Sequence, residues 1–262
     1  MNYNLPYLPK RPEKPRSSGL TMMMDKGLSL EQTGNFIETS AEFTDLVKFG
    51  FGTSIITTKL KDKIKLYREA NIRPYFGGTL FEAFVIRNMF DEYRKYIDEF
   101  GLDMAEVSDG SMFMPHDVKL EYIRKLSEQV TVVSEVGSKQ KGIIIEPERW
   151  VEMMKTELEA GSFKVIAEAR ESGTIGIYNS DGTADESLIK TILTSVKNED
   201  ILWEAPVGKQ QVWFIKLFGP GVNLGNIAPD IVVPLECLRL GLRGDTFFDS
   251  LPDDLHKYMQ EP

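Results

Sequence analysis

The sequence predicts a single (β/α)8 barrel, and three observations favour this fold. Short apolar runs alternate with amphipathic stretches along almost the whole chain, which is typical of a parallel sheet with helices packed outside it. Eight such units within about 230 residues match the usual size of a closed barrel. Polar residues also gather where each apolar run ends, and active sites of barrels are built at the carboxyl ends of the strands.

The first 18 residues form a Pro-rich arm ahead of the barrel. Pro6, Pro9, Pro12 and Pro15 recur at every third position, which favours an extended segment over a helix or a strand. The barrel is expected over residues 19–250, and a polar tail over 251–262.

Eight strands are expected within the barrel. They lie at 19–25, 44–50, 73–78, 104–110, 130–137, 164–169, 200–206 and 222–227. Apolar residues at three- and four-residue spacing predict helices between them, the clearest at 59–70, 117–129, 148–161 and 210–219. Gly161 and Gly219 stand where two of these helices should end.

An open doubly wound sheet is the alternative architecture. It is disfavoured because the sequence DKGL follows the first strand, where a dinucleotide site would carry its glycine fingerprint. Gly50 and Gly52 follow the second strand without a third glycine, so they indicate a tight turn.

Composition excludes several classes of function. The 262 residues include 31 Lys and Arg against 40 Asp and Glu, a net charge of −9, which argues against a nucleic-acid partner. No apolar run approaches the roughly 20 residues of a membrane span, and the first residues lack a secretory signal, so a soluble cytoplasmic protein is expected. One cysteine, Cys237, and two histidines, His116 and His256, leave little for a thiolate or imidazole metal site.

Charged residues mark the carboxyl ends of the expected strands. They include Asp25, Lys26, Lys48, Glu106, Asp109, Glu135, Glu168, Arg170 and Glu204. Strand periodicity puts Glu106 and Ser108 on one face, and likewise Glu168 and Arg170. If these faces point inward, several carboxylates converge at one mouth, where a hard cation such as Mg²⁺ fits best. Alternatively, the charges face solvent or form a structural network inside the barrel.

Two further segments suggest that anions bind near the last two strands. Gly208, Lys209 and Gln210 open the helix after the seventh strand, and Gly225 and Asn226 close the eighth strand. Barrels often hold a phosphate there on backbone N–H groups and a helix N-terminus. A helix cap and a turn explain the same spacing.

Motifs at every strand end together resemble the phosphosulfolactate synthase family. They are GLTMMMDKGLSL (19–30), DLVKFGFGTS (45–54), YFGGTLFE (75–82), EVSDGS (106–111), SEVGSK (134–139), EARESGTIGIY (168–178), EAPVGKQQVWFIKLFGPGVNLGNI (204–227) and ECLRLGLRGDT (236–246). The resemblance implies a (β/α)8 barrel that adds sulfite to phosphoenolpyruvate with Mg²⁺ to give (2R)-2-phospho-3-sulfolactate, the reaction that opens coenzyme M synthesis in methanogens. It also implies a homotrimer.

The resemblance and the residue pattern together assign roles. Lys139 is the expected acid/base, because the family's EVGKK is EVGSK here and only its second lysine remains. Lys48 and Arg170 would orient anionic groups of the substrates. The expected metal ligands are Glu106, Glu135 and Glu168. The expected substrate-binding residues are Lys26, Ser108, Lys209, Gln210, Gly225 and Asn226; Lys209 stands one place along from the family's lysine in EAPQKSQQ.

Two other functions fit the same chain. The family has a plant heat-tolerance branch, so a non-catalytic barrel that acts through protein contacts is one alternative. Another is a different metal-dependent lyase of phosphoenolpyruvate or pyruvate, for which the apolar lip at Met112–Met114 is the supporting feature.

Overall fold

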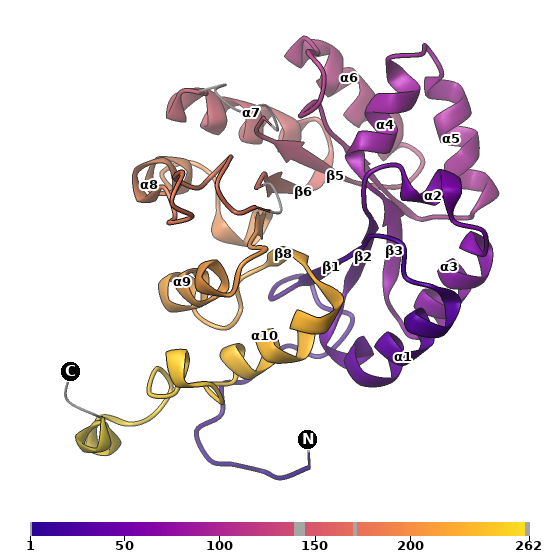
Figure 1. The fold of residues 1–262 in the computed structure, drawn as a ribbon. Coiled ribbons are helices and arrows are strands. Elements are labelled where there is room, and N and C mark those ends of the chain that lie inside the picture. The colour runs from indigo at the N-terminus through magenta and orange to yellow at the C-terminus, as the bar shows by residue number, and fades with distance from the viewer. Residues whose placement is uncertain (1, 139–144, 170–171, 260–262) are drawn as a thin grey trace.

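The computed structural model describes residues 2–138, 145–169 and 172–259, which fold into eight strands with helices between them (Figure 1). The strands are β1 (Thr21–Asp25), β2 (Leu46–Phe49), β3 (Arg73–Phe76), β4 (Met104–Val107), β5 (Thr131–Val136), β6 (Ser162–Ala167), β7 (Ile201–Glu204) and β8 (Leu224–Ile227). Each lies within a segment expected from the sequence or overlaps it.

The strands pair in parallel in the order β3-β2-β1-β8-β7-β6-β5-β4. The two end strands also approach each other: Arg73 at the start of β3 donates from its Nε to Asp103 Oδ2, just before β4, over 3.1 Å. The sheet thus forms a nearly closed barrel, which confirms the predicted fold and rules out the open sheet.

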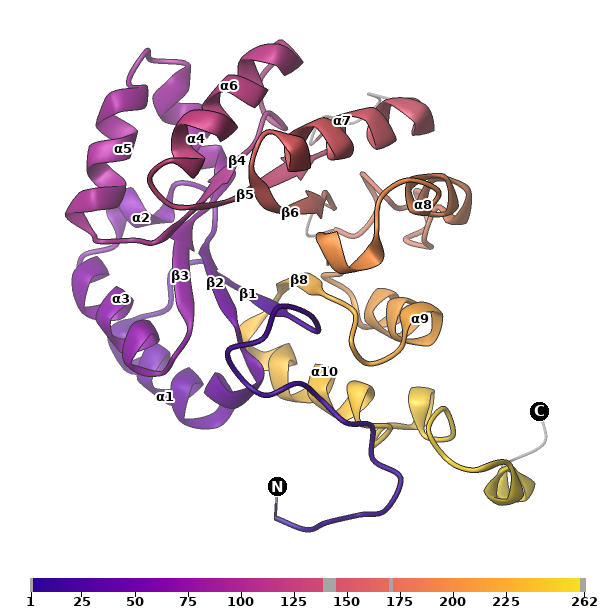
Figure 2. The same cartoon turned by 180° about the vertical axis from the view of Figure 1, so that it is seen from behind.

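Helices surround the barrel, as both views show (Figure 1, Figure 2). They are α1 (Leu30–Ser40), α2 (Thr53–Ile56), α3 (Leu60–Glu69), α4 (Gly78–Val85), α5 (Phe90–Glu99), α6 (His116–Ser127), α7 (Pro147–Glu159), α8 (Glu186–Leu193), α9 (Gly208–Phe218) and α10 (Val232–Arg239). Pro147 stands at the first turn of α7, where proline is favoured. Gly161 and Gly219 follow α7 and α9 with φ of +117° and +80°, so both act as stop signals.

The core has two parts, on the two faces of the sheet. The larger part fills the space between strands and helices and includes Val47, Phe49, Trp203 and Phe214. The smaller part lies inside the barrel and consists of Leu20, Met22, Leu46, Tyr75, Met104, Val133, Ile166 and Leu202. This inner apolar layer fills the barrel below its mouth, which lies at the carboxyl ends of the strands.

The Pro-rich arm lies across the amino ends of the strands. Arg11 pairs with Glu236 of α10 at 3.0 Å. Arg16 pairs at 2.9 Å with Asp45, which also accepts a hydrogen bond from the N–H of Thr21. These contacts anchor the arm to its own barrel, on the side away from the mouth. Among the described residues, no helix has the length and apolar character needed to cross a membrane.

Candidate active site

A ring of charged side chains lies inside the barrel, one layer above the inner apolar residues. Alternate residues of a strand share a face. Each apolar residue of that layer is therefore followed, two positions later, by another inward residue. This residue is charged in β2, β4, β5 and β7 and directly after β6: Lys48, Glu106, Glu135, Glu204 and Glu168 follow Leu46, Met104, Val133, Leu202 and Ile166. All five are buried.

Lys48 is the cation at the centre of this ring. Its Nζ lies 2.8 Å from Glu106 Oε1, 3.1 Å from Glu135 Oε2 and 3.6 Å from Glu204 Oε1. Burial acts to lower the pKa of Lys48, but the surrounding carboxylates outweigh it and hold the pKa well above its usual value. Lys48 is thus a fixed positive charge at neutral pH.

Glu106 is held in place by the start of α4. The N–H of Gly78 donates to Glu106 Oε1 over 2.7 Å. A Cβ on Gly78 would stand 2.6 Å from the Cβ of Ser108 and 2.8 Å from Glu106 Oε1, so only glycine lets the helix approach this closely. Glu106 Oε1 is therefore contacted both by the N–H of Gly78 and by the ammonium of Lys48.

Glu204 has a different environment. Its Oε2 accepts hydrogen bonds from the N–H of Ala169 at 3.0 Å and from Asn226 Nδ2 at 3.3 Å. Burial is the main cause that raises the pKa of Glu204 to about 7, with Lys48 opposing the shift and the negative charge of Glu135 adding to it. At neutral pH this carboxyl group is therefore poised between its two protonation states.

Three of the ring's carboxylates converge closely enough to bind one cation. One oxygen from each of Glu135, Glu168 and Glu204 lies within 4.8 Å of the others. An all-oxygen set of carboxylates suits a hard divalent ion such as Mg²⁺. The residues present therefore fit a magnesium site formed by Glu135, Glu168 and Glu204. Glu106 is not part of this trio and pairs with Lys48.

A cavity of about 420 Å³ opens above the trio at the carboxyl ends of the strands. Its lining combines the charged ring with small polar and apolar groups: Met24, Lys48, Phe51, Thr79, Ser111, Glu135, Glu168, Ala169, Ser172, Glu204 and Asn226. Its volume is typical of a small-molecule site.

The other residues expected to bind substrate have varied positions. Asn226 lines the cavity and has a φ of +57°, a conformation in which its amide reaches Glu204 and the carbonyl of Ala169. Ser108 is buried, and its hydroxyl donates to Glu82 of α4. Lys26 and Lys209 are exposed just beyond β1 and at the start of α9.

Gln210 and Gly225 have structural contacts. Gln210 is buried, and its Nε2 donates to the carbonyls of Gly173 and Gly182, so its amide holds the loop between β6 and α8. Gly225 leaves room for the inner layer, because a Cβ there would lie 2.8 Å from the Cε of Met22. The remaining two candidates, Lys139 and Arg170, lie outside the described residues.

Sequence patterns alone did not single out Glu82 of α4. It accepts hydrogen bonds from Ser108 and, at 2.8 Å, from the N–H of Ser111, and so fixes the loop that follows β4. A glutamate inside a predicted helix gives no signal of this role. Glu204 was visible as a strand-end acid, but only the structure places it with Glu135 and Glu168.

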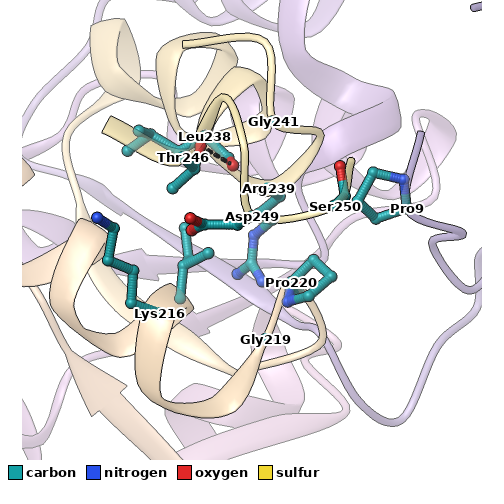
Figure 3. Close-up of a pocket in the computed structure, with 11 residues that line it drawn as sticks. Pro9, Lys216, Gly219, Pro220, Leu238, Arg239, Gly241, Thr246, Asp249 and Ser250 are labelled. Carbon is teal, nitrogen blue, oxygen red and sulfur yellow. Dashed lines mark hydrogen bonds between the residues drawn. The ribbon is translucent and has the colours of Figure 1, made fainter. Parts of the chain in front are cut away.

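A second cavity, of about 400 Å³, lies at the opposite end of the barrel between Pro9 of the arm, α9 and α10 (Figure 3). In its wall, Arg239 donates to the carbonyls of Pro220 and Val222, and Thr246 donates to the carbonyl of Leu238. These contacts tie loops together. The convergent carboxylates are at the mouth, so the candidate active site is there.

The family follows from comparison of the whole chain with known proteins. A model of the (2R)-phospho-3-sulfolactate synthase (ComA) family matches residues 9–245. The chain belongs to this family. It is 41% identical over 244 residues to the phosphosulfolactate synthase of Bacillus subtilis, covering 92% of this chain and 97% of that one. It is 38% identical over 244 residues to the enzyme of the same name from Methanothermobacter thermautotrophicus, covering 91% and 95% of the two chains.

A more distant relative has a different kind of name. Protein HEAT-STRESS-ASSOCIATED 32 of Arabidopsis thaliana is 26% identical over 260 residues, covering 87% of this chain and 88% of that one. Its identity to the chain is well below that of the two synthases, so the comparisons favour the synthases as a guide to activity.

Proposed function

We propose that the protein is a lyase that adds sulfite to phosphoenolpyruvate to give (2R)-2-phospho-3-sulfolactate. The observation that carries this proposal is the site itself: buried Lys48 among four carboxylates beneath an open cavity, in a chain of the phosphosulfolactate synthase family. A barrel that served only as a binding partner would have no need for converging buried charges, which are costly to desolvate.

Mg²⁺ is the proposed cofactor, with Glu135, Glu168 and Glu204 as its protein ligands. Bound there, it would act as a Lewis acid and stabilise the negative charge that develops on the substrate carboxylate during addition. Glu106, grouped with the ligands on sequence grounds, would hold Lys48 instead.

The chain's own cations complete the proposed reaction. Sulfite donates its sulfur electron pair to the methylene carbon, a C–S bond forms, and the electrons of the C=C bond move toward the carboxylate. The carbon that bears the phosphate then takes a proton. Lys48, held positively charged by its carboxylate neighbours, would stabilise the developing negative charge.

Lys139 is the proposed proton donor, since a lysine ammonium can release its proton if its pKa is brought toward the working pH. The high pKa of Lys48 makes that residue a poor donor. Arg170 would orient an anionic group of the substrate through bidentate contacts. Lys26 and Asn226, at and near the mouth, are further proposed contacts for the anionic substrates.

A homotrimer is proposed on the family resemblance. Sedimentation at micromolar protein concentration tests this: a single 29.7 kDa species would contradict it.

The activity is tested by incubating the protein with phosphoenolpyruvate and Mg²⁺, with either sulfite or water, and following the loss of enol absorbance. We expect loss with sulfite only. Loss without sulfite would favour the alternative lyase, and no loss in either arm would favour the non-catalytic role. Glu121→Gln, a change on the exposed face of α6, serves as a matched control for charge substitutions in the site.

A further inference from the structure

Lys119 of α6 is a buried lysine outside the cavity that contacts the backbone of a proposed metal ligand. Its Nζ lies 2.6 Å from the carbonyl oxygen of Glu135, 2.8 Å from Asp109 Oδ1 and 2.8 Å from Glu157 Oε1. The first two contacts are hydrogen bonds donated by the ammonium, and the third is an ion pair. Lys119 and Glu157 are 1% and 0% exposed, so this network lies in the protein interior.

Lys119 meets the carbonyl of Glu135 at the point where β5 extends beyond β4. Their pairing ends at Val107 and Ser134, whereas β5 continues to Val136. The N–H of Thr131 donates to the carbonyl of Asp103 on the β4 side. Alternate residues face the same neighbouring strand, so the carbonyl of Glu135 also points toward β4, beyond its last paired residue. The ammonium of Lys119 stands where the next backbone donor would be.

We propose that Lys119 is a positioning residue for Glu135. By holding the carbonyl of Glu135, it fixes the end of β5 so that the carboxylate of the same residue meets Lys48 and the other two members of the trio. Lys119 also links the end of β5 to Asp109, which follows β4, and to Glu157 of α7. Helices α6 and α7 are neighbours on the outside of β5 (Figure 1). A ligand oxygen must be held to within a fraction of an ångström, which requires such supporting contacts.

Two variants separate positioning from general stability. Lys119→Met and Glu157→Gln both remove the ion pair between Lys119 and Glu157, but only the first also removes the contacts of Lys119 with Asp109 and with the Glu135 carbonyl. The double variant Lys119→Met/Glu157→Gln also removes the donor to the Glu135 carbonyl. It does not leave the buried carboxylate of Glu157 without its cation, so it should fold more readily than Lys119→Met.

The first measurement needs neither metal nor substrate. Amide hydrogen exchange in the segment around Glu135 and Val136 should be about tenfold faster in Lys119→Met and in the double variant, and close to the wild-type rate in Glu157→Gln. The second measurement is Mn²⁺ affinity, which rests on the proposed function. It should weaken by about 10- to 100-fold in the two variants without Lys119, and by less than about threefold in Glu157→Gln.

Equal effects of Lys119→Met and Glu157→Gln on both measurements would overturn the proposal, as would no effect of Lys119→Met. If the double variant does not fold while Glu157→Gln does, Lys119 is required for the fold itself and a positioning role is refuted. A wild-type protein that binds no Mn²⁺ would refute the metal site, and the exchange rates alone would then decide the role of Lys119.

Discussion

Replacing Lys48 with Met should destabilise the metal-free protein strongly, because it leaves several buried carboxylates without their cation. Each of the two shortest contacts, at 2.8 and 3.1 Å, has a gross attraction of about 5 to 6 kcal/mol at an effective dielectric of about 20. The cost of desolvating Lys48 offsets much of this attraction. Removing one partner of a buried pair costs about 3–5 kcal/mol, and for a chain of this length that corresponds to a fall in Tm of about 10 °C.

The loss should depend on pH in a defined direction. Without Lys48, the pKa values of the buried carboxylates rise above their unfolded values of about 4.3. At a pH between the unfolded and the folded pKa of a carboxyl group, the folded variant keeps a proton that the unfolded chain has released. The stability of the variant therefore falls as the pH rises through this range. The stability gap between the wild type and Lys48→Met should therefore be larger at pH 8 than at pH 5.

Urea unfolding in EDTA, followed by tryptophan fluorescence, measures this gap. Lys63→Met is the matched control, because Lys63 is also buried but, within the part of the chain that the structure describes, pairs with a single carboxylate, that of Asp25, at 2.7 Å. Asp25 keeps hydrogen bonds from Tyr67 and from two backbone N–H groups in that variant, so a smaller pH dependence is expected. A Lys48→Met protein as stable as the wild type, or a gap that does not change with pH, would refute this account of the charged ring.

Three further predictions concern the metal and the proton. The pKa of Glu204 is raised to about 7 in the metal-free protein, so below pH 7 this carboxyl group must lose a proton before it binds a cation. Mn²⁺ affinity, measured by calorimetry, should therefore rise by up to about tenfold per pH unit below pH 7 and level off above it. An affinity that does not change with pH would contradict this. Glu135→Gln should lower turnover by roughly 100-fold, and EDTA should abolish it, whereas Glu121→Gln should match the wild type in a steady-state assay. Lys139→Ala should cut kcat by about 10² to 10⁴ with little change in phosphoenolpyruvate binding, and Lys139→Arg should fail similarly; an active Arg variant would leave Lys139 only an electrostatic role.

The sequence was a good guide where one periodicity decided the structure. Strand alternation put Glu106 and Ser108 on one face of their strand, and in the structure both side chains lie beside Gly78 at the start of α4. It gave no such guidance for Asp25, since β1 is apolar on both faces. The structure turns Asp25 outward, where it meets Lys63 and Tyr67 of α3.

Contacts between distant elements were the part that the sequence could not provide. The spacing of Gln210 and Gly225 fits an anion site. In the fold, however, the amide of Gln210 donates to the carbonyl of Gly173, and Gly225 packs against the side chain of Met22. Similarly, nothing local to Lys119 predicts that its ammonium reaches the carbonyl of Glu135. Such contacts depend on how strands end relative to one another, a property of the assembled barrel.

The most direct test of the central claim is the identity of the product formed from phosphoenolpyruvate and sulfite in D₂O with Mg²⁺. We predict one product, seen by phosphorus and carbon NMR, that keeps the phosphate, has a new C–S bond at the former methylene carbon and carries one deuterium on the carbon that bears the phosphate. Unchanged phosphoenolpyruvate, or a product without sulfur, would contradict the proposed reaction.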